Sequence, residues 1–475
     1  MNVAWWAAMA MASESETAPP AEGAPTEAER EADLFGAPPT EAPAVDGLPP
    51  EAPTSEAAGL PFGEAPASDA IERALSAADG RLAWGGRVWW RLSTTVPETG
   101  DGPEDLALDA PGLIDLFADA RPNDVVRAYV RGRVTHDFTL SEGDIDPFTL
   151  EPVQPTQVGL DQAWLKFNVG PRAFVTAGRQ RLQWGVGRFW NPTDFVNQAV
   201  LDPLAVDDLR VGVDALKLHV PAGKANFIAV GMLGSAADVS EVGAAVRSEV
   251  VFGRTEWTTS LAARKGLPYR AGMDISSGVS VLDLRVEGAL TSGPDVHGWE
   301  GTFDLAEAKF PSEVDRAWWP VPQVTAALET TFATGDEDRV TVGVEGFYNG
   351  LGTSDPGLYP WLIAVGEFTP FYLGEWYAGA YAVLPCPGRC DDSTFTVSAV
   401  SNLSDQTAIA RFDARGTVLT WLALDGWVMG HVGPAGGEFR FAIDVPPVVG
   451  VEGLEEGVQI DAPLVSAGVG AQVRF

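Results

Sequence analysis

Short segments in which apolar and polar residues alternate are the feature that most constrains how this chain can fold. In the final segment, SAGVGAQVRF, every odd-numbered residue from Val469 to Phe475 is apolar, and the residues between them are glycine or polar. A period of two is typical of a β-strand that has one apolar side and one polar side. In a water-soluble protein a core would have to cover the apolar side, whereas in a membrane barrel the lipid covers it.

The same alternation recurs from Leu82 to the C-terminus, in segments separated by Gly, Pro, Asn and Asp. These segments number about 16 to 18, within the range of single-chain membrane barrels. Turns such as ARPND and VGPR are short, while four connections are long: 138–156, 184–208, 291–320 and 350–370. This asymmetry is typical of barrels with short periplasmic turns and long outer loops. We therefore predict that residues 80–475 form an all-β fold, a closed antiparallel transmembrane β-barrel.

The segment LIDLFADARPNDVVRAYVRGR predicts which side of the barrel wall is polar. A turn around Pro122–Asp124 places Asp119 opposite Arg127 and Asp115 opposite Arg131, with an aromatic pair between them. Cross-strand pairs of opposite charge stabilise antiparallel strands. The other face of this hairpin carries only apolar residues. We therefore expect the charged face to line the lumen and the apolar face to contact lipid.

The first 75 residues differ in composition from the barrel segment. An apolar stretch that ends in Ala10-Met11-Ala12 fits a secretory signal with an A-x-A cleavage site, although it lacks basic residues, so residues 1–12 are predicted to be a signal peptide. Residues 13–75 are rich in Ala, Pro and Glu and are predicted to be a disordered acidic linker. The net charge of -35 argues against a nucleic-acid partner, which would require Lys and Arg to neutralise phosphates.

Cysteine and histidine are too sparse to indicate a metal site. The two cysteines, Cys386 and Cys390, flank a Pro-Gly turn in CPGRC, and we predict a disulfide that closes this loop. None of the four histidines is close to them in sequence, so neither a metal site nor a cofactor is expected. The acidic segments DGPEDLALD and TGDEDR could bind Ca²⁺ weakly, but they lack the ligand spacing of an EF-hand, and solvated loops are the simpler interpretation.

Charged residues on the polar faces are the candidates for a solute path. Early strands supply mainly cations and later strands supply carboxylates. The residues predicted to face the lumen are Arg87, Arg91, Arg127, Arg131, Arg133, Lys166, Arg179, Glu329, Glu345 and Glu375. Two walls of opposite charge would produce a transverse field that orients polar solutes. Alternatively, each charge pairs with a neighbour in a ladder of salt bridges, which the Asp–Arg hairpin favours.

The stretch AFVTAGRQRLQWGVGRFWNPTDFVNQ, residues 173–198, resembles the porin-like outer-membrane β-barrels of Gram-negative bacteria. Together with the preceding DQAWLKFNVGPR it has a strand, a short turn and a second strand, followed by G-R-Q, W-G and N-P-T-D elements. The resemblance covers this hairpin and the closing strand, and the rest of the chain only in pattern. It implies a passive or substrate-selective pore, and it implies that the barrel-assembly machinery recognises terminal Phe475.

The alternation breaks at Gly178, because Val175, Ala177 and Arg179 have the same parity. Either a bulge turns Arg179 into the lumen, or the strand has left the bilayer there. The loop that follows, 184–208, either folds into the barrel and narrows it or lies outside around an Asn-Pro-Thr-Asp turn. If it folds inward, the candidate constriction residues are Arg188, Asn191, Asp194 and Asp202.

These observations predict a porin-like channel in the bacterial outer membrane, for passive diffusion or selective uptake of small hydrophilic solutes. The alternative is a barrel with a closed lumen that acts as a structural anchor or scaffold, with its acidic linker in the periplasm. An enzyme is not expected, because the sequence contains no G-x-S-x-G, H-E-x-x-H or P-loop motif. The expected partners are outer-membrane lipid and lipopolysaccharide, the barrel-assembly machinery, small polar solutes and further copies of the chain.

Overall fold

The computed structural model describes residues 81–99, 106–143, 152–197, 202–205, 209–234, 242–304, 307, 309–334, 338–387, 390, 392–445 and 458–475. The predicted signal peptide (1–12) and acidic linker (13–75) lie outside these residues, as do parts of both acidic segments considered for Ca²⁺ (101–105 and 335–337). No helix among the described residues has the length and apolar character needed to cross a membrane.

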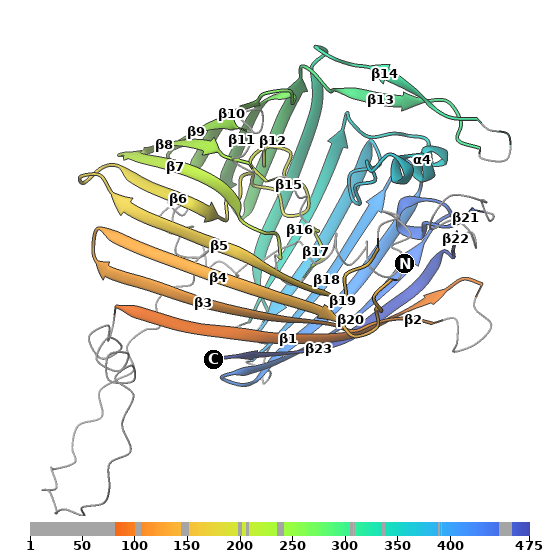
Figure 1. The fold of residues 1–475 in the computed structure, drawn as a ribbon, viewed down its shortest axis with the longest axis horizontal. Helices are drawn as coiled ribbons and strands as arrows, with labels where there is room; N and C mark the ends of the chain where they lie inside the picture. The colour runs from red at the N-terminus through yellow and green to blue at the C-terminus, as the bar shows by residue number, and fades with distance from the viewer. Residues whose placement is uncertain are drawn as a thin grey trace, which may run out of the picture.

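Eighteen strands of the described chain form one closed antiparallel barrel (Figure 1). Each strand pairs with the next barrel strand in the chain, and the first pairs with the last. In chain order they are β1 (Leu82–Pro97), β3 (Pro111–Asn123), β4 (Val126–Asp137), β5 (Thr156–Asn168), β6 (Phe174–Gln180), β7 (Val213–Ala222), β8 (Ala225–Met232), β9 (Gly243–Phe252), β10 (Thr255–Arg264), β11 (Tyr269–Val279), β12 (Leu282–Ser292), β15 (Val321–Thr334), β16 (Asp338–Asn349), β17 (Trp376–Pro385), β18 (Ser393–Asn402), β19 (Thr407–Leu419), β20 (Leu422–Val432) and β23 (Pro463–Arg474). The predicted fold class is confirmed.

The pairing of β1 with β23 closes the barrel. Phe475 continues this pairing through two backbone hydrogen bonds with Gly86, of 2.9 and 3.1 Å. Glycine is required at this position, because a Cβ on Gly86 would lie 2.6 Å from the carbonyl oxygen of Asp115. The closing strand has the predicted faces: Val469 is 57% exposed on the outside, whereas Gln472 is 2% exposed on the inside.

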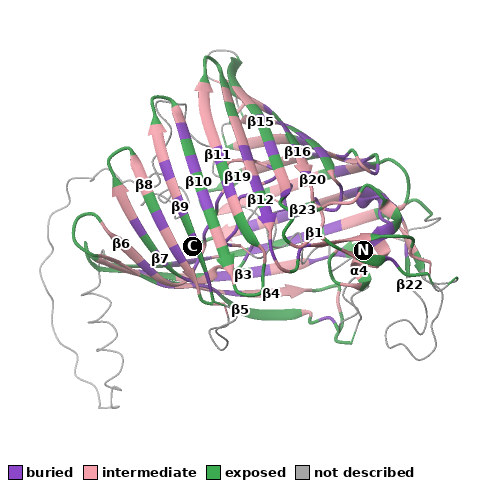
Figure 2. Cartoon of the chain, turned by 90° about the horizontal axis from the view of Figure 1, so that it is seen from above, coloured by how far each residue is buried: buried purple, intermediate pink, exposed green. Residues whose placement is uncertain are grey.

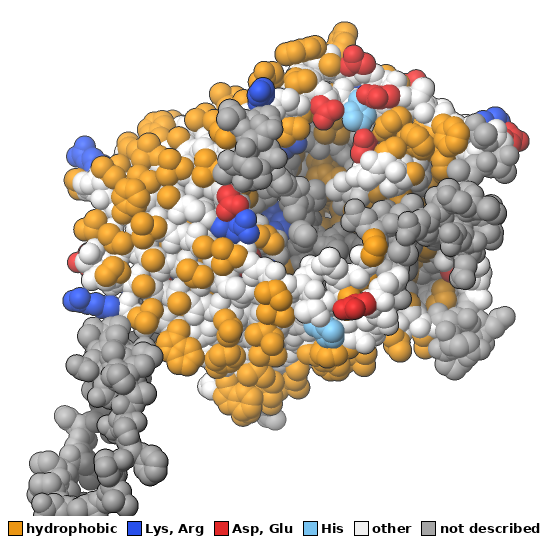
Figure 3. Space-filling view, in the orientation of Figure 1, with side chains coloured by type: hydrophobic (Ala, Val, Ile, Leu, Met, Phe, Trp, Pro, Cys, Tyr) orange, Lys and Arg blue, Asp and Glu red, His pale blue; other side chains and the backbone are white. Residues whose placement is uncertain are grey.

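The barrel wall has an apolar outer face and a polar inner face. Figure 2 shows the alternation as bands of buried and exposed residues along strands such as β9, β10 and β11. On β4, Val130 is 47% exposed on the outside, while its neighbour Tyr129 is 7% exposed on the inside. Hydrophobic side chains spread over the outer wall in the space-filling view, and charged side chains lie mostly near its ends (Figure 3). An apolar surface of this extent is what a barrel covered by lipid requires.

The hairpin β3–β4 has the predicted faces but a different register. Asp119 lies opposite Tyr129, and Asp115 lies opposite Arg133, two residues away from the predicted pairing. A shift of two keeps every side chain on its own face. Asp119 therefore still forms a salt bridge with Arg127, of 2.9 Å, although the two residues are diagonal neighbours.

The register shift originates at the turn of this hairpin. Ala120 pairs with Ala128 and Asn123 pairs with Val126, so two residues of β3 have no partner of their own on β4. Pro122 is one of these two residues, and it has no N–H to contribute to the ladder. Alternation alone does not reveal an irregularity of this kind, because it preserves the faces of the strands.

The two ends of the barrel differ, as predicted. Short turns join the strands at one end, which we call the short-turn end. At the other, the long-loop end, several connections carry structure of their own (Figure 1). These elements are β2 (Ala107–Asp109), β13 (His297–Glu300), β14 (Ser312–Asp315), the 3-10 turn η3 (Pro356–Leu358), helix α4 (Tyr359–Ala364), the 3-10 turn η4 (Glu438–Arg440), β21 (Ile443–Val445) and β22 (Val458–Ile460).

The two cysteines are free thiols at the turn between β17 and β18, so the predicted disulfide Cys386–Cys390 is wrong. Backbone hydrogen bonds close the turn instead. Cys386 N–H donates to the carbonyl of Ser393 at 2.7 Å, and Cys390 N–H donates to that of Pro387 at 2.9 Å. The loop therefore does not depend on a covalent link.

Candidate functional site: the barrel lumen and its inward loop

The connection between β6 and β7 folds into the barrel, and we call its described residues (181–197, 202–205 and 209–212) the inward loop. Phe189 and Trp190, near its middle, are 0% exposed. Its trace lies within the ring of strands in Figure 1. The two interpretations of this loop differed in whether it enters the lumen, and the structure shows that these residues do.

A buried glutamate of the wall holds the middle of the inward loop. Glu345, on β16, accepts hydrogen bonds from three consecutive backbone N–H groups: Arg188 at 2.8 Å, Phe189 at 3.1 Å and Trp190 at 2.8 Å. Converging N–H groups offset the cost of burying a carboxylate. Gly187 permits this geometry, because a Cβ there would lie 2.0 Å from the carbonyl oxygen of Trp190. Glu345 faces the interior as predicted, but it anchors the loop and does not line a solute path.

A second wall glutamate holds the residues on both sides of that contact. Glu287, on β12, accepts a hydrogen bond from Val186 N–H at 2.8 Å. Its other oxygen accepts from the N–H and the hydroxyl of Thr193, at 2.6 and 2.7 Å. Glu287 alternates with Val286 and Gly288 in the sequence, which is consistent with the polar face, but nothing in the sequence indicated its partners, which lie 94 to 101 residues away in the chain.

Two apolar clusters attach the inward loop to different parts of the inner wall. The first contains loop residues Leu182, Trp184, Phe195 and Val196 with wall residues Ala215, Ile228, Val230, Ala245 and Ala289 of β7 to β12. The second contains Phe189, Trp190 and Leu204 with wall residues of β16 to β20 and with Phe371, Phe439 and Phe441 of other long connections. In it the Trp190 ring stacks on Phe347 at a centroid distance of 5.5 Å. The inward loop thus crosses the lumen between two attachment areas.

Asp194 organises the return of the inward loop towards β7. Its carboxylate accepts from the N–H of Trp184 at 3.3 Å and from the side-chain amide of Asn197 at 2.8 Å. It also forms a salt bridge of 3.1 Å with Arg210. Burial raises the pKa of Asp194, and the charge of Arg210 opposes this shift. Asp194 therefore stabilises the loop from within.

The other predicted constriction residues occupy different environments within the loop. Asp202 is buried and accepts from Leu204 N–H at 2.8 Å, and burial raises its pKa to about 6. Asn191 is half-buried within the loop. The guanidinium of Arg188 lies 4.1 Å from the centroid of the Tyr381 ring on β17. Arg188 thus contacts the facing wall at β17, and Asp202 lies close enough to Arg411 on β19 to interact with its charge.

Arginines on the inner face of β1 and the hairpin β3–β4 pair with aspartates of β3. Asp115 bridges Arg87 at 2.9 Å and Arg133 at 2.8 Å. Asp119 forms a salt bridge of 2.9 Å with Arg127. These three cations were predicted to face the lumen, and all three face the interior.

A β-bulge turns Asp161 from the outer face of β5 to the inner face. The pairing of β4 with β5 shifts between Arg131–Gln162 and Gly132–Leu160, which leaves Asp161 as the extra residue. Its side chain is 0% exposed. Strict alternation assigns it to the lipid-facing side, so sequence analysis did not identify it.

Three guanidinium groups converge on the carboxylate of Asp161. Arg131 lies at 3.7 Å, Arg133 at 3.3 Å and Arg181 at 3.2 Å. The first two belong to β4, whereas Arg181 begins the inward loop. Because these three cations share one bulged carboxylate, this part of the wall has more positive than negative charge.

Aromatic rings support the cations of this wall. Tyr129 and Trp164 are stacked at a centroid distance of 5.4 Å, and the guanidinium of Arg127 lies 5.4 Å from the Trp164 ring. The Lys166 ammonium lies 5.7 Å from the Phe174 ring. Cation–π contacts of this type hold positive charge close to the wall.

Arg179 does not face the lumen. Gly178 has a φ of +118°, but the pairing of β6 with both neighbours passes through it without a shift. Arg179 therefore lies on the outer face, where it forms a salt bridge of 2.6 Å with Asp214 of β7 and donates to the Leu160 carbonyl at 3.0 Å. The prediction that Arg179 lies in the solute path is wrong, because the left-handed glycine is accommodated without a bulge.

Carboxylates of the later strands are paired as well. Glu329 accepts from Arg285 at 3.0 Å and from the Tyr381 hydroxyl. Arg91 of β1 forms a salt bridge of 3.2 Å with Asp425 of β20 across the intervening strand β23. The salt-bridge ladder is confirmed at these positions, whereas two walls of unpaired, opposite charge are not observed there.

Glu375 lies one residue before β17, at the long-loop end, and is half-buried. Its carbonyl accepts from Asn349 N–H at 2.8 Å, and its own N–H donates to the hydroxyl of Ser404 at 3.0 Å. The backbone of Glu375 thus joins two connections at the mouth of the barrel.

The inward loop covers carboxylates of the wall and leaves arginines accessible. Glu287 and Glu345, beneath the loop, are 1% and 3% exposed. The side chains of Arg127 and Arg131, on the wall it leaves open, are 23% and 20% exposed. The charge that meets the water of the lumen at these positions is therefore predominantly positive.

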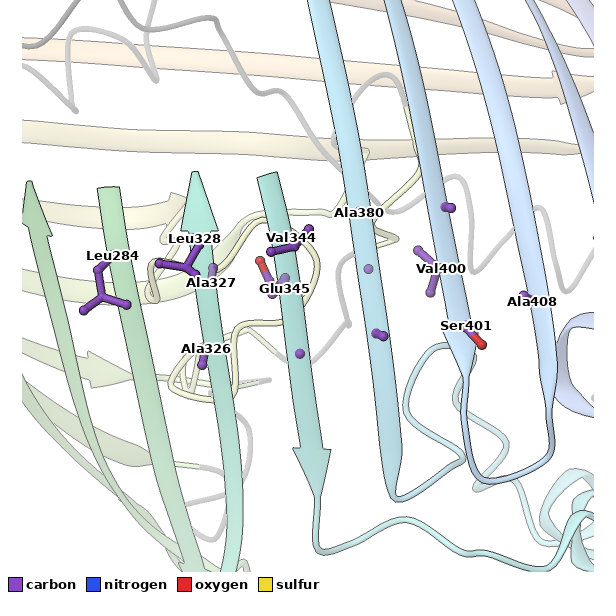
Figure 4. A pocket seen from close by; sticks show the side chains of 14 residues that line it. Leu284, Ala326, Ala327, Leu328, Val344, Glu345, Ala380, Val400, Ser401 and Ala408 are labelled. Carbon is purple, nitrogen blue, oxygen red and sulfur yellow. The ribbon is translucent and has the colours of Figure 1, made fainter. Parts of the chain in front are cut away.

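A groove of about 610 Å³ crosses β15 to β19 (Figure 4). Its outward-facing lining is apolar and consists largely of small residues, among them Ala326, Gly346, Ala378 and Ala380, beside Leu328 and Val344. Leu328 and Val344 are 44% and 54% exposed on the outer wall, so the groove faces lipid and is separate from the lumen. Within the described ranges, no group of three or more His, Cys, Asp or Glu side chains is arranged to hold a metal ion.

The structure is similar to solved β-barrels, although the sequence matches no known protein family and no curated protein. Acinetobacter baumannii OccAB1 aligns over 83% of this chain and 96% of its own, with 11% identity and a TM-score of 0.50. A. baumannii OccAB3 aligns over 83% of this chain and 99% of its own, with 6% identity and a TM-score of 0.50. These likenesses show a shared porin-like barrel fold, and function is argued from the residues of this chain.

Proposed function

We propose that this protein is a porin-like channel of the bacterial outer membrane through which small hydrophilic solutes diffuse passively. The observation that carries the proposal is the inward loop, which crosses a charged lumen and leaves exposed arginines on the wall that it does not cover. A loop attached inside the barrel at two glutamates narrows a passage without covering its mouth. Passage through such a constriction depends on solute size and charge.

The accessible charge favours anionic solutes over cationic ones. Arg127 and Arg131 are partly exposed, whereas the carboxylates that neutralise them, on Asp119 and Asp161, are 9% and 0% exposed. Fixed positive charge along a narrow aqueous path raises the local concentration of anions. We therefore expect modest anion preference, because each of these arginines is already paired.

Single-channel recording in planar bilayers tests the proposal. We expect stable unitary currents and, in a KCl gradient, a reversal potential displaced towards the equilibrium potential of chloride. We also expect liposomes that contain the protein to swell in solutions of small sugars. A folded barrel that gave neither current nor swelling would contradict it and favour the anchor or scaffold. Heat-modifiable migration on a gel, which is typical of folded barrels, provides the control that the reconstituted protein has folded.

The outer wall and the closing strand define the partners that this proposal includes. The apolar outer wall would contact membrane lipid and lipopolysaccharide. Phe475, paired with Gly86 at the seam, would present the terminal strand to the barrel-assembly machinery. Chemical crosslinking in native membranes would distinguish a monomer from a homo-oligomer.

A further inference from the structure

We propose that the bulged residue Asp161 is a positioning residue that fastens both stems of the inward loop to the β4–β5 wall and thereby keeps the aperture steady. The loop stems are Arg181 on the β6 side and residues 209–212 on the β7 side. The part of the inference that concerns the aperture rests on the proposed channel function. The part that concerns the attachment of the stems does not.

Both stems meet at Asp161. On the β6 side, the guanidinium of Arg181 lies 3.2 Å from the Asp161 carboxylate. On the β7 side, Gly212 N–H donates to the Asp161 backbone carbonyl at 3.0 Å. Arg133, itself held by Asp161 at 3.3 Å, donates to the carbonyl of Leu209 at 2.6 Å. One bulged residue therefore contacts the loop at both of its ends, directly or through Arg133.

Gly212 fits this arrangement closely. A Cβ at Gly212 would lie 2.9 Å from the Asp161 carbonyl oxygen. A bulge is also the feature that makes the contact possible, because an unbulged β5 would direct the Asp161 side chain towards lipid. The backbone irregularity, the glycine and the convergent arginines thus occur at one point of the wall.

The attachment at Asp161 is separate from the attachments of the loop middle. Glu345 and Glu287 bind residues 186–193 through backbone N–H groups, and neither contacts the stems in the hydrogen bonds described above. Loss of the Asp161 carboxylate should therefore release the β6-side stem at Arg181 while the middle remains bound. The bond from Gly212 to the Asp161 backbone carbonyl should persist. The expected result is a loop that fluctuates about a fixed centre.

The substitution D161N tests this role with little change in shape. It leaves the guanidinium groups of Arg131, Arg133 and Arg181 around a neutral amide, and neighbouring cations in a poorly solvated site repel one another. D115N is the matched control: Asp115 holds Arg87 and Arg133 on the same wall, and its removal eliminates the same charge without removing a direct contact with either stem.

The first measurement reports on the stems and does not require conduction. A nitroxide label is attached to Q183C in a C386S/C390S background, because Gln183 is exposed and lies two residues after Arg181, the β6-side stem residue that binds the Asp161 carboxylate. In barrels that remain heat-modifiable, we expect D161N to convert most of the immobilised spectral component to a mobile one, and D115N to leave the spectrum like that of the parent. Equal spectra for D161N and the parent would overturn the proposal, as would equal mobility in the two variants.

The second measurement reports on the aperture. We expect D161N to show a several-fold higher frequency of brief closures and subconductance states than D115N, whereas both variants shift the reversal potential in the same direction. Equal closure frequencies in D161N and D115N would overturn the role in the aperture. Absence of currents in the unsubstituted protein would instead contradict the proposed channel function. The spin-label result would still decide whether the Asp161 carboxylate holds the β6-side stem.

Discussion

The backbone N–H of Trp190 donates a hydrogen bond of 2.8 Å to the carboxylate of Glu345, although 155 residues separate the two in the chain. The bond joins the fully buried middle of the inward loop to strand β16. Because the wall carboxylate binds backbone groups, this attachment does not depend on which side chains the loop carries at residues 188–190.

Replacing Glu345 with Ala is expected to loosen the middle of the inward loop without opening the barrel. The change leaves three backbone N–H groups without their acceptor, at about 1–3 kcal/mol for each buried group that stays unsatisfied. Hydrogen exchange of the peptide containing Phe189 and Trp190, followed by mass spectrometry, measures the effect. D425A serves as the control, because Asp425 is a wall carboxylate whose described partner is Arg91 of β1. Exchange no faster in E345A than in D425A would contradict the assigned role.

Glu438 is expected to make the stability of the long-loop end depend on pH. Its buried carboxyl contacts the Tyr377 hydroxyl at 2.7 Å and the Asn402 amide at 2.8 Å. Burial, reinforced by the charge of Asp405, raises the pKa of Glu438 from 4.5 to about 8. The folded state thus binds a proton that the unfolded state releases, so this contribution to stability is complete below about pH 4.5 and is lost as the pH rises to about 8.

The substitution E438Q isolates this effect, because the amide stays neutral. We expect the thermal midpoint of the original protein, relative to that of E438Q, to fall as the pH rises between 4.5 and 8. Differential scanning calorimetry of both proteins in the same detergent measures the difference. A difference that stays constant over this interval would show that the Glu438 carboxyl does not keep its proton in the folded state.

Neutralising the accessible arginines is expected to reduce the anion preference of the channel. R127Q and R131Q each remove one partly exposed cation. In a salt gradient, the reversal potential of each variant should move towards the equilibrium potential of the cation. R133Q removes a cation from the same wall, but one whose side chain is 9% exposed. We therefore expect a smaller shift from R133Q than from either exposed position. Equal shifts at buried and exposed positions would contradict a local effect of accessible charge.

Gly178 is expected to be intolerant of alanine. Its φ is +118°, and a Cβ would lie 2.2 Å from the carbonyl oxygen of Ala163. A non-glycine residue in such a conformation costs roughly 1–3 kcal/mol before the clash is considered. Gly132, on β4, provides the control, because a Cβ there would contact nothing within 4 Å. Urea titrations of the refolded barrels should show a lower free energy of unfolding for G178A than for G132A.

Both cysteines are expected to react with maleimide in the folded barrel without prior reduction. Cys386 and Cys390 are free and exposed at the short-turn end. Mass spectrometry of the intact labelled protein should show two adducts per chain. Labelling that requires a reductant would instead show that the protein isolated from cells contains the disulfide that the spacing suggested.

The alternation predicted the faces of the wall well, because lipid and water impose the same choice on every strand. Val130, Tyr129 and the terminal Val469 lie on the predicted sides. Departures from a period of two were not predictable in the same way. At Gly178, where parity breaks, either a bulge or the end of the membrane-spanning strand was expected, but the bulge lies at Asp161. There the outward apolar residues change from even numbers (Val158, Leu160) to odd numbers (Leu165), a second parity change that the sequence analysis did not use.

The contacts of the inward loop were beyond the reach of a local pattern. The residue types of Arg188 and Asp194 indicated a polar loop. The structure adds their partners, which are the Tyr381 ring for Arg188 and the Arg210 guanidinium for Asp194. Glu345 and Glu287 bind N–H groups that every residue except proline carries, so the sequence of the loop offers no complementary signal. Such pairings become visible only when the barrel brings distant strands together.

The two glutamates that hold the inward loop belong to strands made about a hundred or more residues after it. The segment between β6 and β7 therefore lacks these two acceptors until β12 and β16 belong to the same sheet. The width of the passage is thus set by strands that are remote in the chain from the loop that narrows it.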